Sequence, residues 1–164
     1  MDTPAYIAER MQAEGQKTLE FFRRLEPEEW DAMIYTEGSD WLARDVLAHF
    51  VAAEDGVTRL VESILAGGHG VPVDFDLNSY NERKVVGLNQ VSVEDLLVRF
   101  AALRQKSAVL AKGLSQDDLA ITGRHPWLGE TTIAEILKMM YRHNQIHQRD
   151  IRRTLASGER GQDG

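Results

Sequence analysis

The sequence of 164 residues predicts an all-α protein, a four-helix bundle with one long crossover connection between its second and third helices. Four long segments carry apolar residues three and four positions apart, the spacing that gives an α-helix one apolar face. About 25 residues separate the second segment from the third, many more than a hairpin between antiparallel helices needs. Such a connection can run back along the bundle and make helices two and three parallel. No strand pattern or internal repeat competes with this fold.

The first two helices are predicted at residues 3–25 and 42–66. Pro27 closes the first helix, because proline lacks the backbone N–H that a helix interior uses. In the turn that follows, we expect Trp30 to pack back on the bundle. The second helix ends at the glycine-rich segment GGHG, where Gly67 is expected to adopt the left-handed conformation that ends many helices.

The crossover and the last two helices complete the predicted bundle. A short helix is predicted at residues 79–86, inside the crossover. The third long helix is predicted at residues 92–113, with the hydroxyl of its opening serine as the N-cap. The fourth is predicted at residues 132–155, and its opening TIAE is a capping box, in which hydroxyl and carboxylate each satisfy a backbone amide. We therefore expect residues 1–157 to form one domain and residues 158–164 a disordered tail.

The composition narrows the classes of protein. A hydrophobic content of 43% and a charged content of 27% are ordinary for a globular domain. A formal net charge of -7 predicts no general nucleic-acid binding and leaves room only for a local basic patch in RRTLASGER. The chain has no cysteine, which excludes disulfides, thiolate metal sites and a protein thiol nucleophile and fits a cytoplasmic location. It shows neither the apolar core of a signal peptide nor an apolar window long enough for a membrane span.

Two histidines, His143 and His147, lie four residues apart in the fourth predicted helix, in the segment YRHNQIHQRD. Positions i and i+4 share a helix face, and both histidines lie on or beside the apolar face that should point inward. Burying two neutral imidazoles is unfavourable unless each finds a partner or they share a metal ion. His49, in the segment DVLAHFVAAE of the second helix, would complete a three-nitrogen site with an open coordination position. On the residues alone, a structural or solvent-facing role for these histidines stays open.

The segments WLARDVLAHFVAAED and TTIAEILKMMYRHNQIHQRDI resemble the DinB/YfiT-like superfamily of metalloenzymes. The resemblance covers about residues 30–155 and implies a bundle in up-down-down-up order. It also implies a divalent metal ion, zinc or nickel, held by His49, His143 and His147. Family members commonly have Thr or Ser after the tryptophan to cap helix two, whereas Leu42 stands there in this chain, which weakens the cap and not the ligand set. Homodimers are common in the family, although this sequence has no interface signature of its own.

The chemistry of such a centre sets the predicted function. A divalent ion with three neutral ligands lowers the pKa of a bound water toward about 7, or binds and deprotonates a thiol, and it attracts an anionic group of a small-molecule substrate. The related mycothiol-dependent maleylpyruvate isomerase and bacillithiol transferases use an external thiol. Because this chain lacks cysteine, a thiol nucleophile would have to be a cofactor such as mycothiol or bacillithiol. The sequence therefore predicts a metal-dependent hydrolase or thiol S-transferase. The alternative is a non-catalytic binding or stress-associated bundle with a structural metal or none.

Two carboxylates are candidates for orienting the imidazole rings. Asp45 lies one turn before His49, and Asp150 lies three residues after His147. Each also has an ordinary interpretation, because an acidic residue favours a helix N-terminus and Asp150 can pair with Arg153 on the surface.

Five further residues outside the long helices enter the analysis. His69 is expected to be exposed, in the glycine-rich stop after helix two. His125 precedes helix four and is a candidate fourth metal ligand, which would favour a structural site. Trp127 is expected to seal the core. Asn81 and Arg83 lie in the crossover, which could cover the site and contact an anionic substrate, although an exposed Arg is more often a solvated charge.

Overall fold

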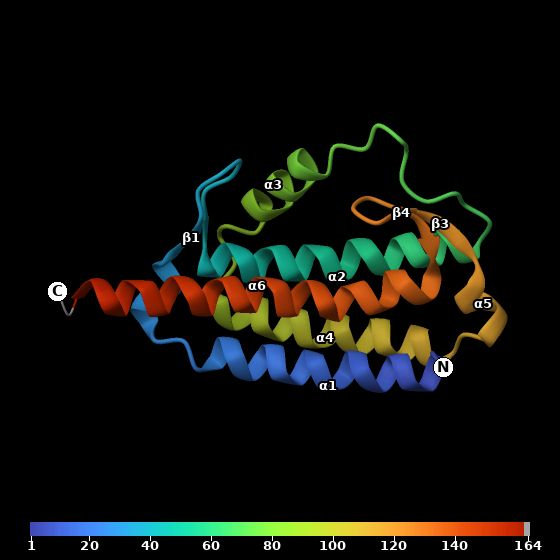
Figure 1. Ribbon diagram of the computed structural model, residues 1–164, viewed down its shortest axis with the longest axis horizontal. Coiled ribbons are helices and arrows are strands. Elements are labelled where there is room, and N and C mark those ends of the chain that lie inside the picture. Colours follow the sequence, from blue (N-terminus) through green and yellow to red (C-terminus); the bar gives the residue numbers. More distant parts are fainter. Residues whose placement is uncertain (163–164) are drawn as a thin grey trace.

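The computed structural model is a bundle of four long helices, α1 (Pro4–Arg23), α2 (Ala43–Leu65), α4 (Val93–Lys112) and α6 (Ile133–Gln162). It describes the backbone of residues 1–162 and the side chains of residues 1–158. Helices α1 and α6 run in one direction and α2 and α4 in the other (Figure 1), which confirms the predicted up-down-down-up order. Both α1 and α2 pack against α4 and α6. Within the described residues, no helix combines the length and the apolar character that a membrane span requires.

Short elements connect the long helices. They are a 3₁₀ helix η1 (Pro27–Asp31), strands β1 (Met33–Tyr35) and β2 (Trp41–Leu42), helices α3 (Leu77–Gly87) and α5 (Gln116–Ala120), and strands β3 (Thr122–His125) and β4 (Gly129–Thr132). The strands form two antiparallel pairs, β1 with β2 and β3 with β4, the second in register from Thr122↔Thr132 to His125↔Gly129. These strands differ from the sequence prediction, which contained no strand. Segments of two to four residues are too short to show the alternation by which a strand is recognised.

Most helix ends lie where the sequence predicted them. The Ser92 hydroxyl accepts the N–H of Asp95, and Gly67 follows α2 with a φ of 99°. The predicted capping box of α6 is only half present, because the Thr132 hydroxyl accepts the N–H of Glu135 while the carboxylate pairs with Lys138.

Helix α6 is longer than predicted. It continues past residue 155 to Gln162, since extending a formed helix avoids the unfavourable nucleation step. Residues 163–164 of the expected disordered tail lie outside the described residues.

The interior consists of two apolar cores separated by a layer of polar side chains. In one core the rings of Phe22 and Phe50 meet edge to face, and Trp30 stacks on Phe22 as predicted. The other core is formed by aliphatic residues such as Ile64 and Ile133. We call the layer between them the polar belt. Its buried members are Glu14, Thr18, His49, Glu54, Arg104, Ser107, Asn144 and Gln148.

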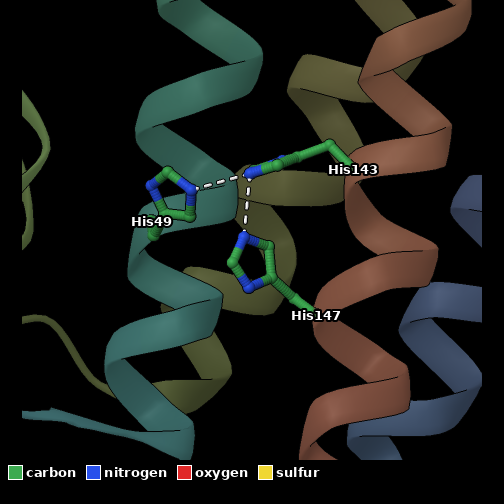
Figure 2. A group of neighbouring side chains, drawn as sticks. All are labelled: His49, His143 and His147. Atoms are coloured by element: carbon green, nitrogen blue, oxygen red, sulfur yellow. Dashed lines mark hydrogen bonds between the residues drawn. The ribbon is translucent and has the colours of Figure 1, made fainter. Parts of the chain in front are cut away.

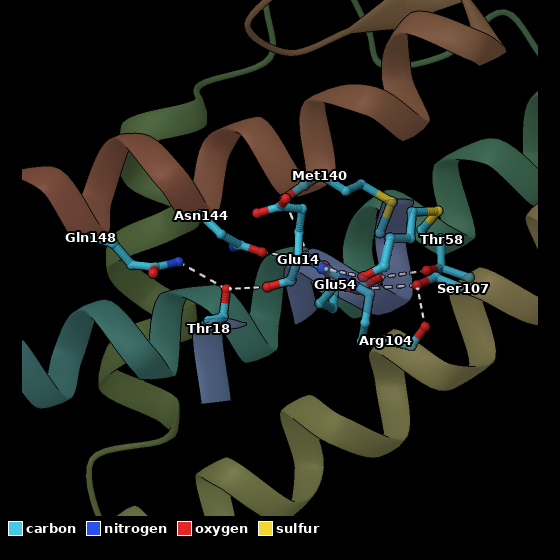
Figure 3. Close-up of polar contacts among 10 residues, drawn as sticks. Glu14, Thr18, Glu54, Thr58, Arg104, Ser107, Met140, Asn144 and Gln148 are labelled. Atoms are coloured by element: carbon cyan, nitrogen blue, oxygen red, sulfur yellow. Dashed lines mark hydrogen bonds and ion pairs between the residues drawn. The ribbon is translucent and has the colours of Figure 1, made fainter. Parts of the chain in front are cut away.

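The polar belt contains an ion pair whose hydrogen bonds join all four long helices (Figure 3). Arg104 of α4 donates to the Glu54 carboxylate and to the Asn144 side chain, both at 2.5 Å, and to the Met11 carbonyl oxygen at 3.1 Å. The Ser107 hydroxyl donates to the other oxygen of Glu54 at 3.1 Å. We call these side chains, Arg104, Glu54, Ser107 and Asn144, the Arg104 network.

The crossover is held against the bundle at two glycines. Helix α3 lies alongside α2 (Figure 1), and a Cβ at Gly56 would lie only 3.0 Å from the Tyr80 hydroxyl, so a larger residue would require the Tyr80 side chain to shift. Gly70 has a φ of 92°, and a Cβ there would clash with the backbone of Arg124. This close approach lets the Arg124 N–H donate to the His69 carbonyl oxygen at 2.9 Å. The crossover and β3 therefore form one wall beside the polar belt.

Candidate metal centre

Three histidine side chains converge in the polar belt. His49 projects from α2, and His143 and His147 project from successive turns of α6 (Figure 2). The Nε2 atom of His143 lies 2.9 Å from the Nε2 atom of His49 and 2.9 Å from that of His147. One ring nitrogen from each residue lies within 4.8 Å of the others, so the three residues form a group that could hold a metal ion. We call these three residues the histidine cluster.

Tyr35 and Asp150 determine which nitrogen of His147 carries the proton. The Tyr35 hydroxyl donates to the Asp150 carboxylate at 2.5 Å and lies 2.7 Å from Nδ1 of His147. Because a hydroxyl has only one proton and gives it to the carboxylate, its oxygen must accept the Nδ1–H of His147. The Nε2 atom of His147 therefore presents a lone pair to the cluster.

The histidine cluster is not satisfied by its own hydrogen bonds. The Nε2 atom of His143 faces two other Nε2 atoms, and a single N–H proton can lie along only one of those contacts. At least one of the two contacts is then left without a hydrogen bond of its own. Zn–N bonds of about 2.0–2.1 Å at angles of 90–110° place ligand nitrogens about 2.9–3.4 Å apart. The two contacts of 2.9 Å that His143 makes lie in this range, and the remaining pair, His49 and His147, has ring nitrogens within 4.8 Å of each other.

Burial keeps the three rings neutral near pH 7. Loss of solvation lowers the pKa of His49 to about 3, with a smaller contribution from the nearby His147. Burial likewise lowers the pKa of His147 to about 4, against the opposing charge of Asp150. The pKa of His143 lies well below its usual value because of burial and of the two neighbouring histidines. Neutral imidazole is the protonation state that binds metals.

Of the two carboxylates predicted to orient an imidazole ring, Asp150 lies near the histidine cluster and Asp45 makes a different contact. Asp150 contacts His147 through the Tyr35 hydroxyl, so it fixes that ring indirectly. Asp45 instead accepts the backbone N–H of Leu42 at 2.9 Å, the ordinary interpretation of an acidic residue at a helix start. This bond also compensates for the missing side-chain cap at Leu42. Tyr35 was missed, because nothing in the sequence relates a residue in a short strand to a histidine 112 positions away.

His125 is buried but does not belong to the group of possible ligands among the described residues. Its Nδ1 atom accepts the N–H groups of Trp127 and Leu128, each at 3.1 Å. His69 is exposed, as expected. The prediction that Trp127 seals the core is wrong, because its side chain is 59% exposed.

A cavity of about 360 Å³ opens beside the histidine cluster. His49 and His143 line it, and so do His125 and Trp127. Of the two crossover residues proposed to contact a substrate, Asn81 lines the cavity, whereas Arg83 is exposed and donates to the Ser79 hydroxyl instead.

A family model places the chain among known proteins. The model described as the DinB superfamily matches residues 6–151, which is most of the sequence. The chain belongs to the DinB superfamily. No curated protein matches this DinB chain.

Three solved structures share the DinB fold of this chain at low sequence identity. An uncharacterised protein from Escherichia coli UTI89 matches with a TM-score of 0.74 and 14% identity, over 97% of this chain and 96% of that one. YfiT from Bacillus subtilis, described as a probable metal-dependent hydrolase with an unusual four-helix bundle topology, has a TM-score of 0.70 and 15% identity, over 95% and 86%. The colibactin self-resistance protein ClbS, in complex with dsDNA, has a TM-score of 0.73 and 11% identity, over 94% and 96%.

Proposed function

We propose that this DinB protein is a metal-dependent hydrolase whose divalent cation, zinc or nickel, is held by His49, His143 and His147. The observation that carries the proposal is the pair of 2.9 Å contacts between Nε2 atoms that no arrangement of protons satisfies. Membership of the DinB superfamily and the description of YfiT support it. When bound, the cation would lower the pKa of a water molecule or thiol and polarise a substrate oxygen.

The residues around the cluster prepare it for this role. Tyr35 holds His147 in the tautomer that points a lone pair at the other two rings. Burial keeps His49 and His143 neutral, so protons compete little for the nitrogens near pH 7.

The description of YfiT as a probable metal-dependent hydrolase favours water over a thiol as the nucleophile. A cavity of about 360 Å³ is large enough for a small-molecule substrate. Thiol S-transfer is therefore the second candidate. Rates of a panel of esters and epoxides that do not change on adding mycothiol, bacillithiol or glutathione support hydrolysis, and rates that require a thiol support transfer.

A structural metal site is less well supported. Structural zinc normally has four protein ligands, whereas three histidines form this group and two of them line a cavity. The dsDNA in the ClbS structure is a property of that protein, and the net charge of -7 keeps our prediction of no general nucleic-acid binding for this chain. A homodimer stays a prediction.

The metal content of tag-free protein tests the proposal. We expect about one divalent ion per chain in the wild type and in His69→Ala, which removes an exposed histidine away from the cluster. His143→Ala removes the ring that contacts both others and should lose most of the metal. Equal metal in His143→Ala and the wild type would refute the proposed ligand set.

A further inference from the structure

The cavity beside the histidine cluster has walls from four parts of the chain. Helix α2 and helix α6 form the inner side, and the crossover with α3 and the turn between β3 and β4 form the outer side. Tyr80 of α3 packs against Phe75, with ring centroids 5.4 Å apart and ring planes tilted by 52°, and both line the cavity. The outer walls therefore belong to the segments that approach closely at Gly56, which faces Tyr80, and at Gly70, which faces Arg124.

Apart from the cation proposed at the histidine cluster, the lining side chains carry few charges, and each of these charges has a partner. Most of the contact surface is apolar or aromatic, including Val57, Leu60, Val71, Phe75, Trp127 and Met139. Apart from the histidines, the described lining contains two ionisable charges. Glu54 pairs with Arg104 at 2.5 Å, and Arg59 pairs with Asp55 at 3.1 Å. A charged ligand would lose its hydration here without gaining an unpaired counter-charge from these walls.

One polar group in the lining has a fixed direction. Nδ1 of His125 accepts two backbone N–H groups, so the proton of the neutral ring is on Nε2. Burial lowers the pKa of His125 to about 4, which keeps the ring neutral near pH 7. All the hydrogen bonds that His125 makes with described residues involve Nδ1, so Nε2–H is left as a donor in a residue that lines the cavity.

We propose that the cavity binds an uncharged, mainly apolar ring compound whose one acceptor, such as a carbonyl oxygen, receives the Nε2–H of His125. The ligand would have about twelve non-hydrogen atoms, given the cavity volume. As the substrate class of the centre, this assignment rests on the proposed function, but the binding contacts themselves require no metal. It differs from the anionic substrate that the sequence led us to expect.

Three probes of similar size and shape test the ligand class. They are 2-acetylnaphthalene, 2-isopropylnaphthalene and 2-naphthoate, which carry a carbonyl, a hydrocarbon and a carboxylate on the same ring system. We would titrate each into protein treated with a chelator and follow ¹H–¹⁵N NMR shifts, which also locate the probe. The ketone should bind about 3- to 10-fold more tightly than the hydrocarbon, from one neutral hydrogen bond, and the carboxylate should bind most weakly. Tightest binding of the carboxylate, or no shifts at the cavity residues, would overturn the proposal.

The variant His125→Asn removes the Nε2–H donor while keeping the hydrogen bonds that hold the turn between β3 and β4. The asparagine side-chain oxygen can take the place of Nδ1 and accept the N–H groups of Trp127 and Leu128, but the variant lacks Nε2–H. It should lose the preference for the ketone and keep the affinity for the hydrocarbon, with a wild-type-like spectrum. An unchanged ketone preference would contradict the role of His125.

Two further comparisons make the test of the ligand class independent of the His125→Asn variant and of the proposed metal ion. Val57→Phe adds a ring to the cavity wall and should weaken all three probes, which checks that they bind there. The ranking of the three probes on wild-type protein tests the ligand class even if His125→Asn does not fold. Because the titrations use metal-free protein, a wrong metal assignment leaves them unaffected, and their failure leaves the metal assignment standing.

Discussion

The polar belt contains two buried polar groups built in opposite ways. In the Arg104 network a cation meets an anion, and both carboxylate oxygens of Glu54 have donors. Within the described residues, only Nε of Arg104 is buried without a partner. In the histidine cluster, three neutral rings of one kind present nitrogens to one another, and their protons cannot satisfy both short contacts.

This difference indicates which group is structural and which is suited to function. A closed ion pair needs no ligand and links four helices across the middle of the bundle. Its side chains fit tightly, since a Cβ at Gly15 of α1 would lie 2.7 Å from Cγ of Arg104. The histidine cluster, by contrast, is complete only with an added cation, and it lies beside a cavity. The first region holds the helices in place for the second.

The largest expected effect comes from opening the Arg104 network. Arg104→Met leaves the Glu54 carboxylate buried without its cation, which should lower the free energy of unfolding by about 3–5 kcal/mol in urea denaturation. Arg59→Met, which breaks an exposed pair with Asp55, should cost about 0–1 kcal/mol. The double variant Arg104→Met/Glu54→Met should recover much of the loss, because no charge is then left unpaired. Equal losses of unfolding free energy in Arg104→Met and Arg59→Met would show that the buried Arg104 network contributes no more to stability than an exposed ion pair.

Acid should affect the metal-free histidine cluster next. The folded pKa of His147, about 4, lies below its unfolded value of about 6.5, so the unfolded chain takes up protons first. The contribution of His147 to stability is therefore nearly constant only well above pH 6.5, and it falls as the pH decreases, by about 2 kcal/mol at pH 5. His49 and His143 act in the same direction. Urea denaturation of chelated protein at pH 7 and pH 5 measures the loss.

The variant His147→Gln controls for this acid effect. It lacks the titrating ring, so its stability should depend less on pH over the same interval. A wild-type stability that is flat from pH 7 to pH 5 would mean that the rings are not held in their neutral form.

The smallest effect should come from the group that orients the cluster. Tyr35→Phe removes the hydroxyl between His147 and Asp150 but keeps the ring. We expect zinc affinity, measured by competition with a fluorescent chelator, to fall about 10- to 100-fold, as for other groups that hold a ligating histidine. Tyr6→Phe, at an exposed position on α1, is the matched control and should not change the affinity. An unchanged affinity in Tyr35→Phe would show that the hydroxyl does not determine the tautomer.

The sequence predicted those features that arise from neighbouring residues. Apolar spacing and caps such as Ser92 located the four long helices and the short helix in the crossover. The i, i+4 spacing brought His143 and His147 to one face, and the apolar pattern of the second helix placed His49 toward the same interior, a set that the family resemblance also implied. Proximity of the three rings is a finding of the structure, whereas their role as ligands stays a prediction.

Features that join distant parts of the chain could not be predicted in this way. Arg104 and Glu54 are 50 residues apart, and a single Arg or Glu in an amphipathic helix usually faces solvent. The contact between Gly70 and Arg124, which joins the crossover to β3, likewise links residues far apart in the sequence. These contacts depend on how whole helices and turns pack, which local patterns do not encode.

The most direct test of the account is a crystal of tag-free protein with zinc, measured at and below the zinc absorption edge. We predict one anomalous peak in the histidine cluster, about 2.0–2.1 Å from the Nε2 atoms of His49, His143 and His147. A zinc-saturated crystal with no peak between these three rings, or with zinc bound only at His125 or His69, would contradict the central claim.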